Sequence, residues 1–290
     1  MSGNDERIAN WKKDHRDDGS TFAPHEYYNE TFQSINNRLR MAGEELHSRI
    51  LEIGCGEGAF LAICHSNGFE AVGVNPRLPE LSRASEKDTR GVIVQALGES
   101  LPIRDEAFDC VASTSVLEHV IDPAAVISES VRVLKPKGIL YIGAPDYSKC
   151  FREGHYGIRW FPMPKRVARV YLWLRGVNRR DREYLESLQF ITRRQLIQDL
   201  RLHRVTIIDL NHAHYLSVRK NARQYFMGKI DAPETIRSPV PRKIITALIK
   251  IGVGKHLMLI LALFFYTPIL RLKSDFSAEI NLLVRKEQAT

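Results

Sequence analysis

The chain has 290 residues, of which 44% are hydrophobic and 26% are charged. These fractions are ordinary for a globular protein and argue against a disordered chain, and the length suits one large core or a core with a smaller appendage. The cysteines form no C-x-x-C pair, so the sequence predicts neither a disulfide framework nor a zinc site. The four cysteines are Cys55, Cys64, Cys110 and Cys150.

The two halves of the chain differ in charge. Residues 1–146 contain 15 Lys and Arg against 23 Asp and Glu, a net of −8, and residues 147–290 contain 27 against 11, a net of +16. The basic half indicates either a solvated face or contact with something anionic, such as lipid headgroups, a phosphorylated substrate or nucleic acid. Because the polar first residues lack an apolar signal segment, we expect a cytoplasmic protein.

The first half of the chain alternates between short apolar runs and helical patterns. Residues 1–48 read as a polar lead-in followed by one helix. Such alternation predicts a parallel, doubly wound α/β sheet. The predicted strands are 50–53, 71–74, 92–95, 108–112 and 139–142, and the predicted helices are 59–65, 79–85 and 123–134.

After Pro145 the pattern changes. Residues 147–190 are aromatic and basic with no clear strand, and we interpret them as an insertion that covers the substrate. A helix over 192–202 and strands over 205–210 and 280–284 then continue the sheet, and residues 211–273 interrupt it.

The second interruption contains the uncharged segment 257–270. Its 14 residues fall short of the ~20 needed to span a bilayer. A spanning helix would also place the final strand on the wrong side of the membrane. We therefore expect a core, dimer or interfacial helix inside a hydrophobic helical insertion of about 239–273.

The stretch RILEIGCGEGAF, residues 49–60, places Gly54, Gly56 and Gly58 directly after the first strand. Ligands of open α/β sheets bind at the carboxyl ends of the strands, where glycine lets the backbone approach closely and the next helix presents free N–H groups. The spacing differs from the dinucleotide fingerprint G-x-G-x-x-G, which argues against a dehydrogenase.

Five segments in this order resemble the class I S-adenosylmethionine-dependent methyltransferases, in particular the ubiquinone-pathway-like, type 11 branch. The segments are LEIGCGEG, VGVNPRLPELSRA, ALGESLPIRDEAFDCV, STSVLEHVIDP and RVLKPKGILYIGAPD. The resemblance is close from Arg49 to Asp146 and thinner over 191–210 and 278–286. It implies S-adenosyl-L-methionine as cofactor and a Rossmann-like methyltransferase fold with seven strands, mostly parallel with an antiparallel last strand. The implied regions are a lead-in (1–48), a cofactor-binding core (49–146), an insertion (147–190) and the interrupted end of the sheet (191–290).

The resemblance also implies the cofactor-binding residues. Asn75 stands where the family usually has an acidic residue that accepts hydrogen bonds from the ribose, and Leu97 stands where it has an aspartate near the adenine. An amide lacks the charge-assisted strength of a carboxylate, so Asn75 predicts weaker cofactor binding, and Leu97 is a second departure from the family pattern. The expected cofactor-binding residues are Glu52, Gly54, Cys55, Gly56, Gly58, Asn75, Gly98, Glu99, Ser115 and Val116.

Methyl transfer from a sulfonium depends mainly on alignment, and it needs a base only when the acceptor arrives protonated. His119 in LEHV is the candidate base, and the alternative is that Glu118 and His119 only orient their loop. Asp146, His155 and Tyr156 are expected near the substrate. No His, Cys and Asp cluster has metal-ligand spacing, so no metal is expected.

These features favour methyl transfer to an oxygen of a small or lipid/sugar-type acceptor at or near a membrane. Residues 164–176 mix basic and aromatic side chains suited to the anionic inner face of a membrane. One alternative is a scaffold protein with a degenerate site. Another is a nucleic-acid methyltransferase, which residues 113–116 disfavour because they lack an Asn/Asp-Pro-Pro-Tyr-type signature. The sequence identifies neither the acceptor nor the oligomeric state.

Overall fold

The computed structural model describes residues 49–76, 92–212 and 279–288, with single residues between 29 and 43. The chain divides into two compact units, Met1–Asp209 with Ala278–Thr290, and Leu210–Ser277. The predicted helix 79–85 and the uncharged segment 257–270 lie outside the described residues. Among those that are described, no helix has the length and apolar character needed to cross a membrane.

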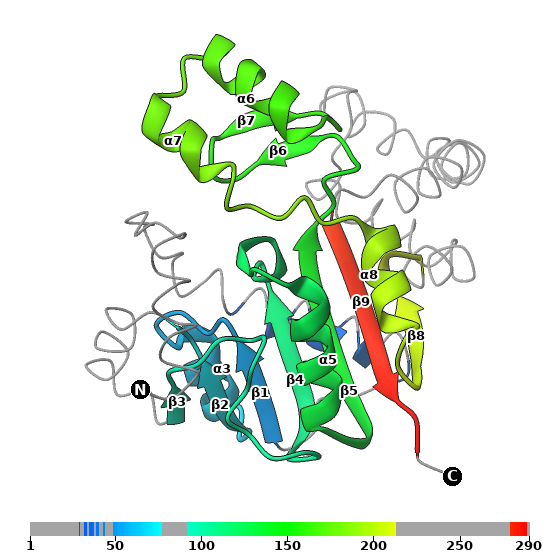
Figure 1. Ribbon diagram of the computed structural model, residues 1–290. Helices are drawn as coiled ribbons and strands as arrows, with labels where there is room; N and C mark the ends of the chain where they lie inside the picture. Colours follow the sequence, from blue (N-terminus) through cyan, green and yellow to red (C-terminus); the bar gives the residue numbers. More distant parts are fainter. Residues whose placement is uncertain are drawn as a thin grey trace, which may run out of the picture. The chain divides into compact units, whose positions relative to one another are not determined.

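Seven strands of the described residues form one sheet in the order β3-β2-β1-β4-β5-β9-β8 (Figure 1). The strands from β3 to β5 pair in parallel, whereas β9 runs antiparallel to both β5 and β8. This arrangement confirms the predicted fold and its antiparallel last strand. The bounds are β1 Arg49–Ile53, β2 Glu70–Val74, β3 Val92–Val94, β4 Phe108–Thr114, β5 Leu134–Pro145, β8 Val205–Asp209 and β9 Glu279–Lys286.

Helices α3 (Ala59–Ser66), α5 (Pro123–Val133) and α8 (Arg193–Leu200) begin and end close to their predicted bounds. Asp122 caps the N-terminus of α5, and its Oδ1 accepts hydrogen bonds from the N–H groups of Ala124 and Ala125. Pro123 follows at the first helical position, where the missing N–H costs little. The apolar face of α5 then packs into the main hydrophobic core.

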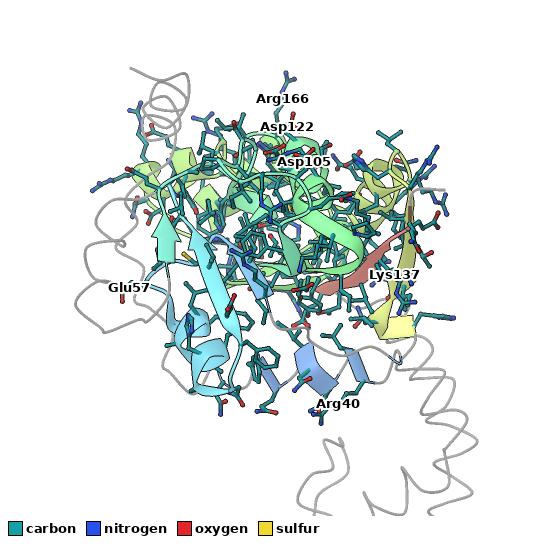
Figure 2. All side chains as sticks on the ribbon, turned by 90° about the horizontal axis from the view of Figure 1, so that it is seen from below. Arg40, Glu57, Asp105, Asp122, Lys137 and Arg166 are labelled. Carbon is teal, nitrogen blue, oxygen red and sulfur yellow. The ribbon has the colours of Figure 1, made fainter. Side chains whose placement is uncertain are left out.

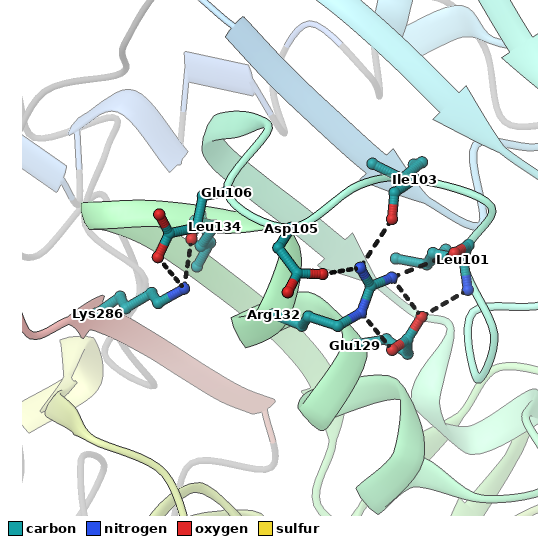
Figure 3. A network of polar contacts seen from close by, with 8 residues as sticks. All are labelled: Leu101, Ile103, Asp105, Glu106, Glu129, Arg132, Leu134 and Lys286. Atoms are coloured by element: carbon teal, nitrogen blue, oxygen red, sulfur yellow. Dashed lines mark hydrogen bonds and ion pairs between the residues drawn. The ribbon is translucent and has the colours of Figure 1, made fainter. Parts of the chain in front are cut away.

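A network of charged side chains joins α5 to the loop between β3 and β4 (Figure 3). Arg132 donates to Glu129 at 2.7 Å and to Asp105 at 2.6 Å, and Glu129 accepts from the N–H of Leu101 at 2.7 Å. The hydrogen bond from Arg132 is the main reason that the pKa of Glu129 is lowered. The network therefore fixes the loop that carries two of the expected cofactor-binding residues.

The insertion contains the hairpin of β6 (Phe151–Glu153) and β7 (Ile158–Trp160), then α6 (Lys165–Leu174) and α7 (Arg179–Tyr184). The prediction of no strand in this region was wrong, because three-residue strands are too short for an alternating pattern to stand out. The insertion has its own small hydrophobic core, formed by Tyr147, Ile158, Trp160, Ala168, Leu172 and Leu185.

Candidate functional site

The glycine turn follows β1 and has a left-handed backbone. Gly54, Gly56 and Gly58 have φ angles of 77°, 52° and 79°, which side chains with a Cβ rarely adopt. A Cβ placed on Gly54 would lie 2.3 Å from Cγ2 of Val116, just beyond β4. The turn thus requires glycine at this position, and it packs against a second segment that was expected to hold the cofactor.

Asn75 directly follows β2 and is buried. Its Nδ2 donates a hydrogen bond to the carbonyl of Gly56 at 3.1 Å. A carboxylate has no hydrogen to donate, so the usual acidic residue would not make this contact. The sequence identified Asn75 as a weaker acceptor and missed its second role, which is to hold the glycine turn against the end of β2.

Two buried carboxyl groups lie beside these strand ends. Oε2 of Glu52 and Oε2 of Glu99 have no hydrogen-bond partner among the residues that the structure describes, whereas Oε1 of Glu99 accepts from the N–H of Ile121 at 2.9 Å. Burial raises the pKa of Glu52 to about 8. A buried polar atom without a partner costs about 1–3 kcal/mol, so both oxygens are suited to accept hydrogen bonds from a ligand.

Three other expected cofactor-binding residues have packing or backbone roles. A Cβ on Gly98 would lie 2.9 Å from a side-chain methyl of Ile53, so the packing requires glycine here. Cys55 is buried, and its Sγ would lie 2.4 Å from a Cβ on Gly73. Ser115 has a φ of 54° and is exposed, and it leads from β4 into the segment that packs on Gly54.

His119 lies on the short helix η1 (Leu117–His119) and meets the insertion. Its Nε2 is 3.2 Å from Nε2 of His155, and its Nδ1 is 3.1 Å from the hydroxyl of Tyr184. Nδ1 of His155 in turn contacts Oε1 of Glu153. The structure thus brings together the candidate base and one of the residues expected near the substrate.

Two further acids, Glu118 and Glu153, are buried around this pair of histidines. Burial is the main cause that raises the pKa of Glu118 to about 7, with Glu153 raising it further and His155 lowering it. Glu153 and Tyr184 were not predicted from the sequence. Glu153 lies two residues before His155, but nothing in the linear sequence indicates that Tyr184 reaches the same place.

The other residues expected near the substrate are engaged within the protein. Oδ1 of the buried Asp146 accepts from the N–H and the hydroxyl of Ser148, which forms a tight turn after β5. Tyr156 donates its N–H to Glu153 and its hydroxyl to the carbonyl of Asp181. Both residues therefore shape the insertion, while Oδ2 of Asp146 is buried without a hydrogen-bond partner among the residues that the structure describes.

Comparisons with known proteins find similarity over the part of the chain that contains the glycine turn. Residues 51–142 match the model of a family described as a methyltransferase domain. An uncharacterized methyltransferase of Mycobacterium sp. (strain JLS) is 32% identical over 139 residues, which are 48% of this chain and 55% of that protein. A ubiquinone biosynthesis O-methyltransferase of Pseudomonas fluorescens (strain SBW25) is 29% identical over 157 residues, covering 46% of this chain and 65% of that protein.

Among solved structures, the YcgJ protein of Bacillus subtilis is 16% identical with a TM-score of 0.48, over 89% of this chain and all of that one (100%). The chain spans about half the length of the curated relatives it matches. Residues 51–142 form a class I S-adenosylmethionine-dependent methyltransferase domain. The methyl donor of this class is S-adenosyl-L-methionine.

The residues present fit this donor. The turn from Gly54 to Gly58 offers backbone groups with no Cβ between them and a ligand, and it adjoins the partly buried Val116. The bare oxygens of Glu52 and Glu99 suit the ammonium and hydroxyl groups that such a molecule carries.

Proposed function

We propose that the protein is an S-adenosylmethionine-dependent methyltransferase that methylates an oxygen of a small or lipid/sugar-type acceptor at or near a membrane surface. The observation that carries the proposal is the continuity of one short segment. Val116 packs against Gly54 of the cofactor turn, and three residues later His119 meets the side chains of the insertion. A candidate donor site and a candidate base thus lie only three residues apart in the chain.

When bound, the donor supplies a methyl group already activated on a positively charged sulfur. The glycine turn would bind it through backbone groups, with Glu52, Asn75 and Glu99 accepting hydrogen bonds. His119 would act as the base for an acceptor hydroxyl, because an imidazole can accept a proton near neutral pH. A base in this position supports a hydroxyl acceptor, because a hydroxyl must lose its proton when its oxygen is methylated.

The outer face of α6 supports a membrane-surface location. Its apolar side chains on this face are 54% to 69% exposed, and Arg166 and Arg169 lie beside them. Arg166, labelled in Figure 2, extends away from the ribbon. An exposed apolar stripe with tryptophan and flanking arginines suits the headgroup region of an anionic leaflet. The exposed apolar residues are Val167, Val170, Trp173 and Leu174.

Transfer of labelled methyl groups tests the activity. Purified protein is incubated with methyl-labelled S-adenosylmethionine and a total lipid extract, and the extract is then separated and counted. We expect label in an acid-stable, oxygen-linked product, with transfer reduced at least about a hundredfold in His119→Gln, in line with the loss of a general base. A wild-type protein that binds the donor and leaves every fraction of the extract unlabelled would contradict this acceptor class.

Sedimentation with vesicles tests the surface location. We expect the protein to bind vesicles that contain phosphatidylserine and to lose this binding in Trp173→Ser and in Arg166→Glu. The matched control is Leu202→Ser, because Leu202 is 82% exposed but lies beyond α8 in another part of the chain. Equal binding of all four proteins, or none by the wild type, would contradict a role for α6.

The main alternative is a scaffold protein that keeps the fold and does not bind the donor. Asn75 and Leu97 are the residues that motivate it. The hydrogen bond from Asn75 to Gly56 argues against it, because the amide preserves the shape of the turn instead of disrupting it. Direct measurement of donor binding separates the two.

A further inference from the structure

Four side chains form a continuous chain of contacts across three elements. Glu153 at the end of β6 contacts Nδ1 of His155, Nε2 of His155 lies 3.2 Å from Nε2 of His119, and Nδ1 of His119 lies 3.1 Å from the hydroxyl of Tyr184 on α7. The two imidazole rings meet edge to face with their centres 4.9 Å apart. Both ring nitrogens of both histidines therefore have side-chain partners.

The buried carboxylate fixes the direction of this chain. The carboxylate of Glu153 also accepts from the N–H of Tyr156 at 3.0 Å and from the hydroxyl of Tyr147 at 3.3 Å. Because a carboxylate only accepts, His155 must donate from Nδ1, and the neutral ring then has its lone pair on Nε2. His119 must donate from its own Nε2, which leaves its Nδ1 as the acceptor for the Tyr184 hydroxyl.

We propose that Glu153 and His155 form a proton relay behind His119, and that the hydroxyl of Tyr184 is the group through which the acceptor's proton enters it. The inference rests on the proposed function, since a relay of this kind serves an acceptor that must lose a proton. Tyr184 is the catalytic residue that meets the acceptor. Glu153 and His155 are positioning residues that make Nδ1 the basic nitrogen of His119.

The proton movements balance along the chain. The acceptor hydroxyl gives its proton to the oxygen of Tyr184 while Tyr184 gives its own to Nδ1 of His119. His119 then passes its Nε2 proton to Nε2 of His155, which ends as an imidazolium beside the carboxylate of Glu153. The acceptor oxygen keeps the electron pair that forms its bond to the methyl carbon, and the pair of the broken carbon–sulfur bond goes to sulfur.

The surroundings favour a positive charge on His155. Oε1 of the buried Glu118 lies 3.9 Å from Nε2 of His119, so two acids face the two rings. Tyr147 and Tyr156 both contact Glu153, and Tyr147 carries no charge at neutral pH because burial raises its pKa. Among the side chains that the structure describes, the ion-pair partners of Glu118 and Glu153 are His119 and His155.

Nuclear magnetic resonance of histidine ring nitrogens tests the relay without an acceptor. The full chain is labelled with ¹⁵N-histidine, and the two signals are assigned with His119→Gln and His155→Phe. In the wild type at pH 8 we expect His155 with its hydrogen on Nδ1 and His119 with its hydrogen on Nε2. S-adenosylmethionine is titrated into the same samples.

Glu153→Gln gives the sharpest expected change. The N–H of Tyr156 still needs an acceptor, so the amide oxygen stays there and the amide NH₂ faces Nδ1 of His155. Both histidines should then reverse their tautomers, with His119 carrying its hydrogen on Nδ1. The matched control is Glu183→Gln, because Glu183 is an exposed residue of α7 whose partner is Arg179, and it should leave both signals unchanged.

His155→Phe keeps an aromatic ring beside His119 and removes the accepting nitrogen, so His119 should lose its tautomer preference. An unchanged His119 signal in both Glu153→Gln and His155→Phe, or a hydrogen on Nδ1 of His119 in the wild type, would overturn the relay. Failure of the wild type to bind S-adenosylmethionine would overturn the proposed function while the tautomer result still stands. Binding that stays within about twofold in Glu153→Gln, together with reversed tautomers, supports both.

Discussion

The glycine turn and the histidine cluster are built in opposite ways. The turn is a local structure of backbone, in which Gly54 to Gly58 follow one strand and are held by Val116 and Asn75. The cluster is a structure of side chains, in which His119 meets residues that lie 36 and 65 positions further along the chain. The shape of the turn is therefore set by nearby backbone, whereas the surroundings of His119 depend on how the insertion folds.

The largest expected effect falls on the insertion. Trp160 is fully buried in the small core of this region, where its ring packs against Tyr147 and Phe190. Trp160→Ala should cost about 3–5 kcal/mol of unfolding free energy for the insertion. Hydrogen exchange should show faster exchange over residues 151–185, with exchange of β1 and β4 unchanged. Faster exchange of the whole sheet would mean that the two regions unfold as one.

The next largest effect is the pH dependence of the unfolding free energy that the buried Glu52 on β1 should cause. The pKa of the buried Glu52 is about 8, above the value of 4.5 for an exposed glutamate, so the folded state binds the extra proton between these values. Unfolding free energy should therefore fall as pH rises from about 5 to 8, on the order of a few kcal/mol. Glu52→Gln should remove most of this fall in denaturant titrations at several pH values. A slope identical to that of the wild type would contradict a buried acid at this position.

Gly54→Ala tests whether donor binding depends on the close packing of the glycine turn. The new Cβ would meet Val116 and would also impose a left-handed backbone on alanine. Gly68→Ala is the matched control, because Gly68 has a φ of 84° and open space around the added atom. We expect the dissociation constant for S-adenosylmethionine to rise at least about tenfold in Gly54→Ala and to stay within about twofold in Gly68→Ala. Equally weakened binding of S-adenosylmethionine in both variants would show that the left-handed backbone of alanine is responsible, and not the packing of the glycine turn.

The smallest expected effect is that of Asn75→Asp. The carboxylate gains strength as an acceptor for hydroxyl groups but loses the hydrogen bond to Gly56 and repels its carbonyl. We expect donor binding to change by less than about fivefold and the unfolding free energy to fall by about 1 kcal/mol. Calorimetry and denaturant titration measure the two separately. If Asn75→Asp bound S-adenosylmethionine more than about tenfold more tightly, the hydrogen bond from Asn75 to Gly56 would have no role in donor binding.

The same contrast explains which features could be predicted from the sequence. The strands of the sheet were predictable because runs such as residues 50–53 and 139–142 are buried on both faces and bounded by turn residues. The turn was predictable because left-handed backbone and close packing both demand glycine. His119 could be proposed from its place after β4.

The contacts of the insertion could not be predicted in this way. The β6–β7 hairpin is too short to show a pattern, and the meeting of Tyr184 with His119 depends on how α7 packs in three dimensions. The donor role of Asn75 also needs the position of the Gly56 carbonyl, which a family pattern does not supply.

The most direct test of the central claim is calorimetric titration of the full chain with S-adenosylmethionine, with NADH as the matched negative ligand. We expect a single site with a micromolar dissociation constant for S-adenosylmethionine and no measurable heat with NADH. No binding of S-adenosylmethionine by a folded protein would contradict the account and would leave the scaffold alternative in its place.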